Sequence, residues 1–367
     1  MNAHTPPPAD PDPGSPSAAD TDHRAATAPV PETGTTTAPG TGTKAAGGTE
    51  AAGGNGPEVG NGPEAARGPA AGDGTEAATE VFLAHRSLLF TVAYEVLGSA
   101  ADAEDVVQET WLRWAAADRA GVLEPRAYLV RIATRQALNR LRTVRRLREA
   151  YVGPWLPEPL LTAPDVAEDA ELADSVSTAL MLVLETLSPT ERAVFVLREV
   201  FDVGYGEIAE AVGKAPAAVR QIAHRARGHV EARRPRRTVA PAAGRAALES
   251  FRQALETGNP QGLLDVLAPD VVLMSDGGGV KQAARRPVLG ADKVSRYVMG
   301  WGHRPGLLVT AEPAVVNGGP ALVLHVNGEA DGVLTASVED GRITALYYVR
   351  NPQKLTRVSE PVPLTLR

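Results

Sequence analysis

The sequence predicts a multidomain protein in which a disordered N-terminal tail precedes two all-α units and one α+β unit. Three patterns favour this arrangement. The first 78 residues are rich in Pro and Gly, two later segments combine Arg with apolar residues at helical spacing, and the chain after residue 243 passes from helices to alternating strands. The predicted boundaries are 1–78 for the tail, 79–150 and 175–238 for the all-α units, 151–174 for the linker between them, 243–350 for the α+β unit and 351–367 for a C-terminal tail.

Composition restricts the kind of protein that this chain can be. Residues 1–78 hold 12 Pro and 14 Gly and almost no large apolar residue, so they cannot bury enough surface to offset the entropy of ordering. Their ten acids and three bases account for the whole net charge of −7, which leaves the remaining chain neutral. The absence of cysteine excludes disulfides and thiolate metal sites. There is no membrane-length apolar run and no recognisable signal peptide, so we expect a cytoplasmic protein without a cofactor.

The first all-α unit is predicted to contain three helices. One spans 81–98 and ends at Gly98, the second starts with Asp102 in a capping pair with Asp105, and the third starts at Pro125. The third helix carries eight Arg and no acid between residues 126 and 148. Its predicted buried face is Val130, Ala133, Ala137, Leu141 and Val144. A charged face is often only solvated, but like charges at helical spacing repel, so a phosphate-bearing partner would explain this one.

Two segments of this unit, DAEDVVQETWLRW (102–114) and EPRAYLVRIATRQALNRLR (124–142), resemble region 2 of the sigma-70 family, in its extracytoplasmic-function (ECF) group. The resemblance implies that one set of residues docks on the clamp helices of RNA polymerase: Asp102, Asp105, Gln108, Glu109 and Trp111. It also implies that a second set handles the −10 promoter element, where a base is extruded: Arg131, Arg135, Asn139 and Arg142. Asn can read a base edge and Arg can hold phosphate, which agrees with these roles.

The linker is expected to be more than a solvated spacer. It holds four Pro and, from Glu158 to Asp174, six acids and no base, which predicts an extended path before a helix begins near Pro164. A solvated acidic linker is one interpretation, but exposed Trp and Leu usually find a partner surface. Its WLPEP motif (155–159) also resembles one ECF subgroup with an extra C-terminal domain. That resemblance implies that the linker docks this domain or runs through the polymerase.

The second all-α unit has the pattern of a helix-turn-helix. LSPTERAVFVLREV (187–200) opens with Ser188 and Glu191 in a capping box, and GEIAEAVG (206–213) is a short helix closed by glycine. A basic helix follows from Pro216, and residues 214–237 hold one Lys and seven Arg against a single acid. The second helix of such a motif enters the major groove of DNA. The residue before Pro216 is Ala215, whose side chain cannot cap the helix, and the missing N-cap should cost roughly 1 kcal/mol of local stability.

This whole unit resembles sigma region 4, which implies docking on the polymerase flap and recognition of the −35 element. The residues that the resemblance places there are Lys214, Arg220, Gln221, His224, Arg225 and Arg227. Arg can pair with guanine and Gln with adenine, whereas the remaining cations suit phosphate. His224 and His229 have no carboxylate or thiol cluster beside them in sequence, so no metal site is predicted.

The third unit is predicted to hold helices over 243–259 and 260–268, a strand over 271–275, a helix over 290–301 and a four-stranded antiparallel meander over 307–349. This order resembles the SnoaL-like, nuclear-transport-factor-like (NTF2-like) cone. DGGG (276–279) and NPQKL (351–355) match motifs of the sigma subgroup with this domain, although Val280 here separates DGGG from Lys281. The predicted regulatory contact between domains comprises Trp155, Leu156, Pro157, Glu158, Pro159, Asp276, Gly277, Gly278 and Gly279.

The cone fold also occurs in polyketide cyclases and ketosteroid isomerases, so catalysis is an alternative. The candidate acid–base groups are Asp276, His303, His325, Asp331 and Tyr347. Likeness of fold is a weak warrant for function, and isolated His and Asp on strands and turns are mostly structural. We therefore predict no catalytic residue, and we expect the third unit to regulate rather than catalyse.

The sequence thus predicts an ECF-type sigma factor that binds core RNA polymerase and promoter DNA. The third unit is expected to control activity in cis, in place of a separate anti-sigma factor, so deleting the residues after about 240 should change promoter output without abolishing polymerase binding. The alternative is a helix-turn-helix regulator with a ligand-sensing or cyclase-like C-terminal domain. A repressor would bind its duplex tightly without polymerase, whereas a sigma factor binds weakly alone.

Overall fold

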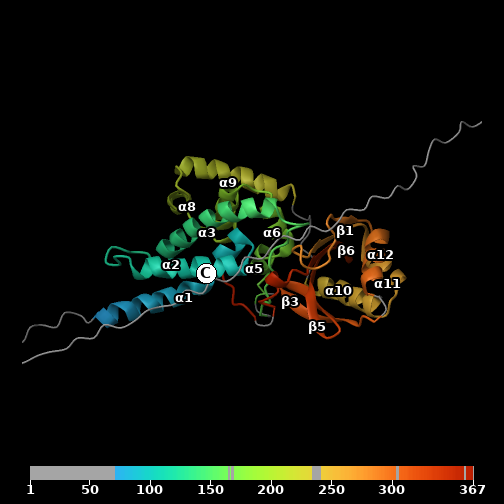
Figure 1. Cartoon of the computed structure of the whole chain (residues 1–367). Coiled ribbons are helices and arrows are strands. Elements are labelled where there is room, and N and C mark those ends of the chain that lie inside the picture. The colour runs from blue at the N-terminus through green and yellow to red at the C-terminus, as the bar shows by residue number, and fades with distance from the viewer. Residues whose placement is uncertain are drawn as a thin grey trace, which may run out of the picture. The chain divides into compact units, whose positions relative to one another are not determined.

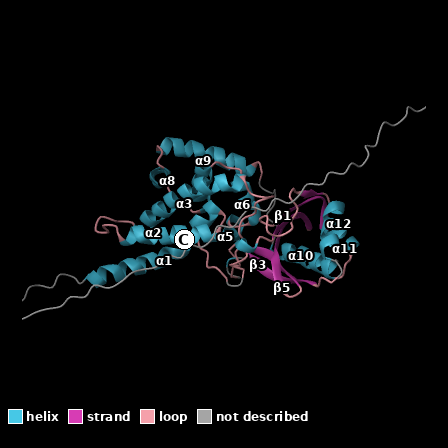
Figure 2. Cartoon of the chain, in the orientation of Figure 1, coloured by secondary structure: helices cyan, strands magenta, loops and turns pink. Residues whose placement is uncertain are grey.

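A computed structural model describes residues 71–163, 166, 169–233, 241–302, 306–358 and 361–366. Helices make up the first part of the described chain and a sheet with covering helices the last part (Figures 1 and 2). Helix α1 (Ala71–Leu97) begins ten residues before the predicted start at Val81, so the predicted end of the tail falls inside a helix. The carbonyl of Ala78 accepts a 2.9 Å hydrogen bond from Trp114 Nε1, which anchors this early part of α1. The predicted tail up to residue 70 lies outside the described residues.

The first all-α unit is a bundle of α1, α2 (Ala100–Ala115) and α3 (Pro125–Glu149). Gly98 ends α1 with a φ of +69°, as its position predicts. The predicted start of α2 at Asp102 is two residues late, because Ser99 is the N-cap and its hydroxyl accepts a 3.2 Å hydrogen bond from the Asp102 amide. Helix α3 starts at Pro125 as predicted, and its predicted apolar face is buried apart from Val144, which is half-buried.

The short helix α5 (Ala170–Ser175) precedes the second all-α unit, whose first helix is α6 (Thr178–Glu185). The predicted helix start near Pro164 lies outside the described residues. The capping box of Ser188 and Glu191 opens α7 (Pro189–Phe195) as predicted, but the single helix predicted to residue 200 becomes a π-helix, η1 (Val196–Val200). Helix α8 (Tyr205–Val212) ends at Gly213 with a φ of +67°, and Ala215, the N-cap of α9 (Pro216–Glu231), makes no side-chain capping bond.

The C-terminal unit is a mixed sheet with helices on one face. Its helices are α10 (Pro241–Glu256), α11 (Pro260–Val266) and α12 (Ala291–Gly302), and its strands are β1 (Leu267–Asp276), β2 (Val288–Leu289), β3 (Val309–Val316), β4 (Gly319–Val326), β5 (Glu329–Glu339) and β6 (Arg342–Val349). The described strands lie in the order β2-β1-β6-β5-β4-β3. The antiparallel meander from β3 to β6 is as predicted. The parallel pairing of β1 with β6 was not predicted. A short 3-10 helix, η2 (Pro352–Lys354), follows the sheet.

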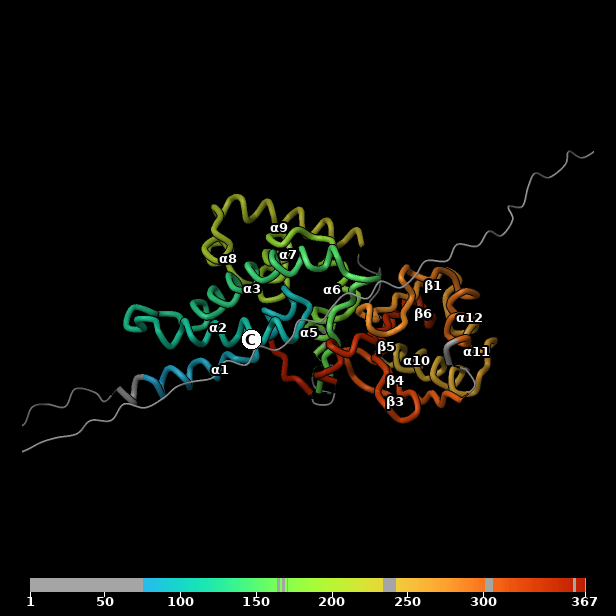
Figure 3. The backbone as a smooth tube through the Cα atoms, in the orientation of Figure 1, coloured from blue at the N-terminus to red at the C-terminus, as the bar shows by residue number. Residues whose placement is uncertain are grey.

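The apolar core of the two all-α units also takes in parts of the linker and of the C-terminal tail. Leu160 of the linker is fully buried in it, and Leu364 of the tail is 8% exposed. Figure 3 shows the red C-terminal segment passing from the sheet back towards α1 and α2, where the Thr365 amide donates to the Thr91 hydroxyl at 3.1 Å. A second core lies between the sheet and its helices. Within the described ranges, the structure shows no helix of the length and apolarity needed to span a membrane.

Candidate functional site

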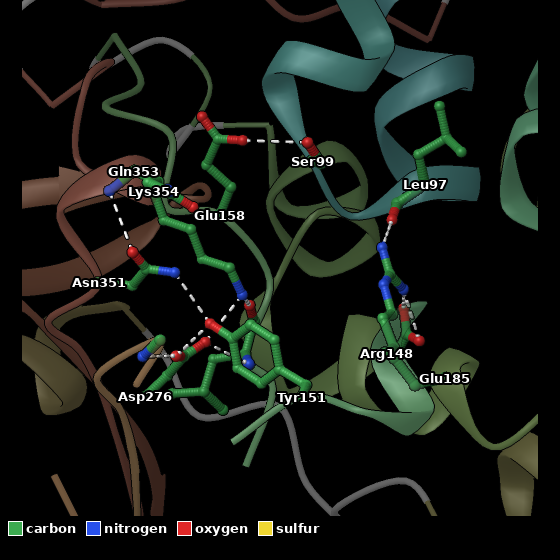
Figure 4. A network of polar contacts seen from close by, with 12 residues as sticks. Leu97, Ser99, Arg148, Tyr151, Glu158, Glu185, Asp276, Asn351, Gln353 and Lys354 are labelled. Atoms are coloured by element: carbon green, nitrogen blue, oxygen red, sulfur yellow. Dashed lines mark hydrogen bonds and ion pairs between the residues drawn. The ribbon is translucent and has the colours of Figure 1, made fainter. Parts of the chain in front are cut away.

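The carboxylate of Asp276, at the end of β1, is the centre of a polar network between the linker and the C-terminal unit (Figure 4). The side chain is fully buried. Oδ1 accepts hydrogen bonds from the Tyr151 hydroxyl at 2.6 Å and the Gly278 amide at 3.0 Å. Oδ2 accepts from the Leu156 amide at 2.9 Å and from Lys354 Nζ at 2.7 Å. Through the Leu156 amide, this carboxylate holds the WLPEP and DGGG motifs together. Its removal would leave Lys354 buried without its partner, which is costly.

Trp155 of the linker lies between two cations. Its ring centroid is 3.6 Å from the Arg148 guanidinium and 4.1 Å from Lys354 Nζ. The ring edge also covers Gly98, where a Cβ would lie 2.8 Å from Trp155. Burial lowers the pKa of Lys354 to about 8, and the neighbouring Asp276 opposes that shift. Lys354 belongs to the NPQKL motif that the sequence analysis noted, but its role as partner of Asp276 was not predicted.

Glu158 joins the linker to the N-terminus of α2. Its side chain is 3% exposed, and Oε2 accepts hydrogen bonds from the Ala100 amide at 2.7 Å and the Ser99 hydroxyl at 3.2 Å. Its own amide donates to the Gly98 carbonyl at 2.9 Å, and its carbonyl accepts from the Tyr94 hydroxyl at 2.6 Å. The carboxylate therefore accepts from a backbone amide that is unpaired at the start of α2, where the helix dipole also favours a negative charge. Burial raises the pKa of Glu158, although these donors oppose the rise.

Asn317, in the turn between β3 and β4, connects the sheet with both the linker and the helices. It is 2% exposed and has a φ of +53°. Its Nδ2 donates to the Tyr94 hydroxyl at 2.6 Å and the Val176 carbonyl at 2.9 Å, while Oδ1 accepts from the Leu160 amide at 3.1 Å. The sequence predicts only the meander around Asn317, because no local pattern reveals a partner 223 residues away.

The residues predicted to contact the −35 element lie on or beside α9 with their side chains exposed. They are Lys214, Arg220, Gln221, His224, Arg225 and Arg227. The opposite face of α9 is buried through Val219, Ile222 and Ala226. The Arg227 guanidinium pairs with Glu199 at 2.6 Å, on the π-helix η1. The side of α9 that faces away from the core is therefore exposed, as a groove-binding helix requires.

The residues predicted for the −10 element lie along α3, but two of them contact the second all-α unit. Arg131 Nη1 pairs with Glu210 Oε2 at 2.6 Å, and Arg135 Nη2 donates to the Glu210 carbonyl at 2.6 Å. Asn139 and Arg142 are exposed and joined by a 3.3 Å hydrogen bond. A cleft of about 630 Å³ beside this contact is lined by both units. Glu210 on α8, which contacts both of these cations, was not predicted from the sequence.

The residues predicted to bind polymerase lie on α2, and α3 pairs with several of them. Arg140 binds Asp102 through Nε at 2.8 Å and Asp105 through Nη2 at 2.8 Å. Asp105, Gln108 and Glu109 are exposed. Trp111 is half-buried, with its ring centroid 5.1 Å from that of Phe82. Helix α2 thus presents an acidic, partly neutralised face.

The acid–base candidates of the C-terminal unit do not gather in one site. Asp331 accepts hydrogen bonds from the Tyr348 hydroxyl at 2.6 Å and from Arg350 Nε at 2.7 Å, whereas the side chain of Asp276 is held by Tyr151 and Lys354. Tyr347 lies 3.4 Å from the Ser337 hydroxyl, and Nδ1 of His325 has no hydrogen-bond partner within the described ranges. His303 lies outside the described residues. Among the described residues, no cluster of His, Asp and Glu is suited to hold a metal ion.

Comparison with known proteins agrees with this geometry. The family models described as Sigma-70 region 2 and Sigma-70, region 4 match residues 81–147 and 177–230. The chain is 37% identical over 288 residues to the ECF RNA polymerase sigma factor SigJ of Mycobacterium tuberculosis, covering 75% of this chain and 92% of SigJ. It is 34% identical over 276 residues to the probable ECF RNA polymerase sigma factor SigI of that species, covering 74% of this chain and 92% of SigI.

The crystal structure of M. tuberculosis SigJ is similar with a TM-score of 0.62 and 35% identity, covering 78% of this chain and 100% of that chain. The likeness therefore extends through both helical units into the C-terminal sheet, which confirms the predicted SnoaL-like fold. With relatives that match nearly end to end, the chain belongs to the ECF group of RNA polymerase sigma factors: it binds core RNA polymerase and promoter DNA to initiate transcription, and it carries a SnoaL-like unit after its two sigma regions.

Proposed function

We propose that three surfaces of this sigma factor divide the work of initiation. Helix α9 recognises the −35 element with Arg220, Gln221 and His224, and its neighbouring cations hold phosphate. Helix α3 handles the −10 element with Arg131, Arg135, Asn139 and Arg142. Helix α2 docks on the clamp helices of the polymerase, and region 4 docks on its flap. The exposed side chains of α9 and the acidic face of α2 support this division.

The free protein is, in this proposal, in a closed state. Glu210 on α8 of region 4 engages Arg131 and Arg135 on α3 of region 2, which leaves these cations occupied without DNA. The −35 and −10 elements are separated by roughly 80 Å at about 3.4 Å per base pair. Two regions that touch through α3 and α8 cannot reach both elements at once, so they must separate on the polymerase.

The C-terminal unit controls that separation in cis, taking the role that a separate anti-sigma factor would have. The observation that carries this proposal is the set of four hydrogen bonds on Asp276, two of which, from Tyr151 and Leu156, hold the linker against the sheet. Glu158, in the same linker segment, caps α2. A linker segment held to both the sheet and α2 in this way favours one arrangement of the sigma regions, and releasing it shifts the population towards the open one.

Catalysis by the C-terminal unit is not part of this proposal. Asp276 and Asp331 are each held by a Lys or Arg, an arrangement that suits a structural carboxylate better than a proton carrier.

The proposed location is the cytoplasm, because a promoter-reading subunit acts together with RNA polymerase on the chromosome.

Run-off transcription with core polymerase tests the regulatory proposal, with the full-length chain and its Asp276→Asn variant. The substitution keeps the size of the side chain but leaves Lys354 without its charged partner, so the linker should undock. We expect the yield of specific transcript to rise several-fold while affinity for core polymerase is retained. Asp270→Asn, an exposed acid on the same strand, is the matched control and should match the wild type. Equal transcription from Asp276→Asn and wild type would remove the proposal.

A further inference from the structure

A cavity of about 300 Å³ lies between the linker and the DGGG turn. Val152 and Gly153 of the linker form one wall, and Ser275 with the loop 277–285 forms the other. The walls approach closely, since a Cβ on Gly153 would lie 3.7 Å from Arg285 Cα. The volume is at the lower end of the ~300–1,000 Å³ typical of ligand pockets, so an occupant would be small.

The charged side chains that line this cavity are all cationic. Lys281 and Arg285 line it, and none of its lining residues is an acid. Lys281 Nζ lies 3.3 Å from Asp331, but Arg350 already binds that carboxylate through Nε at 2.7 Å and Nη2 at 2.9 Å. Arg285 makes no ion pair with any residue that the structure describes. An excess of positive charge therefore faces the cavity and favours an anion.

Ser275 adds an independent polar group. It is fully buried and lines the cavity, yet its hydroxyl oxygen has no hydrogen-bond partner in the described part of the chain. An unpaired buried polar group costs roughly 1–3 kcal/mol, so such a group needs an explanation. Gly279, which also lines the cavity, has a φ of +75°. A buried hydroxyl and two cations together match the chemistry of an oxyanion.

We propose that this cavity binds a small oxyanion, a phosphate- or carboxylate-bearing molecule, and that the bound anion strengthens docking of the linker. Both walls are needed to enclose the occupant, so it binds the docked state alone and stabilises it by mass action. The cavity adjoins the Asp276 network directly, because Tyr151 precedes Val152 and Asp276 follows Ser275. The regulatory half of this inference rests on the proposed control of the sigma regions by the linker.

The test is amide hydrogen exchange of the full-length protein without polymerase, followed over the peptide that contains Leu156. Inorganic phosphate and succinate serve as probes, and sodium chloride at equal ionic strength is the reference. At a probe concentration ten times its Kd, exchange from the undocked state should slow about elevenfold. Arg285→Ser and Ser275→Ala should each weaken probe binding at least several-fold. Arg286→Ser, a neighbouring exposed Arg outside the cavity lining, is the charge-matched control and should bind as the wild type does.

Three results would overturn the inference. One is that neither probe protects the Leu156 peptide more than chloride does. Another is that Arg286→Ser weakens binding as much as Arg285→Ser, which would indicate a diffuse surface attraction. The third is that a probe binds without slowing exchange in this peptide, which would separate the cavity from docking. Because no polymerase is present, these outcomes are independent of the transcription experiment on Asp276→Asn, and either proposal can fail alone.

Discussion

Glu95 is a buried carboxyl group among the residues that hold the sigma regions together. It is fully buried, with Oε1 bonded to the Ser175 hydroxyl at 2.9 Å and Oε2 without a partner among the described residues. Burial raises its pKa from 4.5 to about 8, which the Ser175 hydroxyl and Arg192 oppose. The side chain of Arg192 is directed to the Glu95 carbonyl, at 3.0 Å, and to the Glu185 carboxylate. Glu95 is therefore mostly protonated in the folded protein at neutral pH.

The stability of the protein should consequently depend on pH through this residue. With a folded pKa of about 8 and an unfolded value near 4.5, the folded state binds the proton more tightly. Its contribution is fully present below pH 4.5 and is lost as the pH rises towards 8, by up to ~1.4 kcal/mol per pH unit. Glu95→Gln should thus match the wild type near pH 5 and exceed it by at most roughly 3 kcal/mol at pH 7.

Urea unfolding at several pH values between about 5 and 8 measures this difference directly. Glu149→Gln, an exposed residue at the end of α3, should give no pH-dependent difference from the wild type. A gap between Glu95→Gln and the wild type that stays constant with pH would show that Glu95 is ionised in the folded state.

At the scale of elements, the start of α2 depends on a residue from another segment. Glu158→Ala removes the acceptor of the Ala100 amide and should lower the free energy of unfolding by roughly 1–3 kcal/mol. Because α2 carries the predicted polymerase-binding residues, affinity for core polymerase should fall as well. Glu158→Gln keeps an acceptor and should lose less of both. Thermal unfolding and polymerase titration measure the two effects, with Glu149→Ala as control, and a Glu158→Ala variant as stable as this control would contradict the capping role.

The elements that sequence predicts well are those with local signals. The ends at Gly98 and Gly213, the start at Pro125 and the capping box at Ser188 follow from the backbone preferences of a few residues. The π-helix after Phe195 and the parallel pairing of β1 with β6 have no such signal, because tertiary packing decides them. The residues of the interdomain contact were predicted equally unevenly. The WLPEP and DGGG motifs indicated Leu156 and Asp276. The roles of Tyr151, Lys354 and Asn317 were not predicted, because they depend on contacts between distant segments.

At the scale of the whole molecule, the closed state depends on contacts between region 2 and region 4. Glu210→Lys replaces the charged partner of Arg131 with a like charge, beside Arg135, which donates to the Glu210 carbonyl, so the two regions should separate more readily. We expect higher transcription from the full-length variant at a fixed polymerase concentration. Glu231→Lys changes the net charge equally on the same helix-turn-helix and controls for a general gain in DNA affinity. A similar increase from both variants would assign the effect to charge alone.

The central claim is that the C-terminal unit holds regions 2 and 4 in the closed arrangement, and a distance measurement tests it most directly. The chain has no cysteine, so spin labels can be placed at two chosen sites, Thr143→Cys on α3 and Ala217→Cys on α9, both exposed. The distance distribution is then recorded by pulsed electron resonance for the full-length protein with and without Asp276→Asn. We predict one narrow distribution in the first protein and a broader, longer one in the variant. The same narrow distribution in both proteins would contradict control by the C-terminal unit.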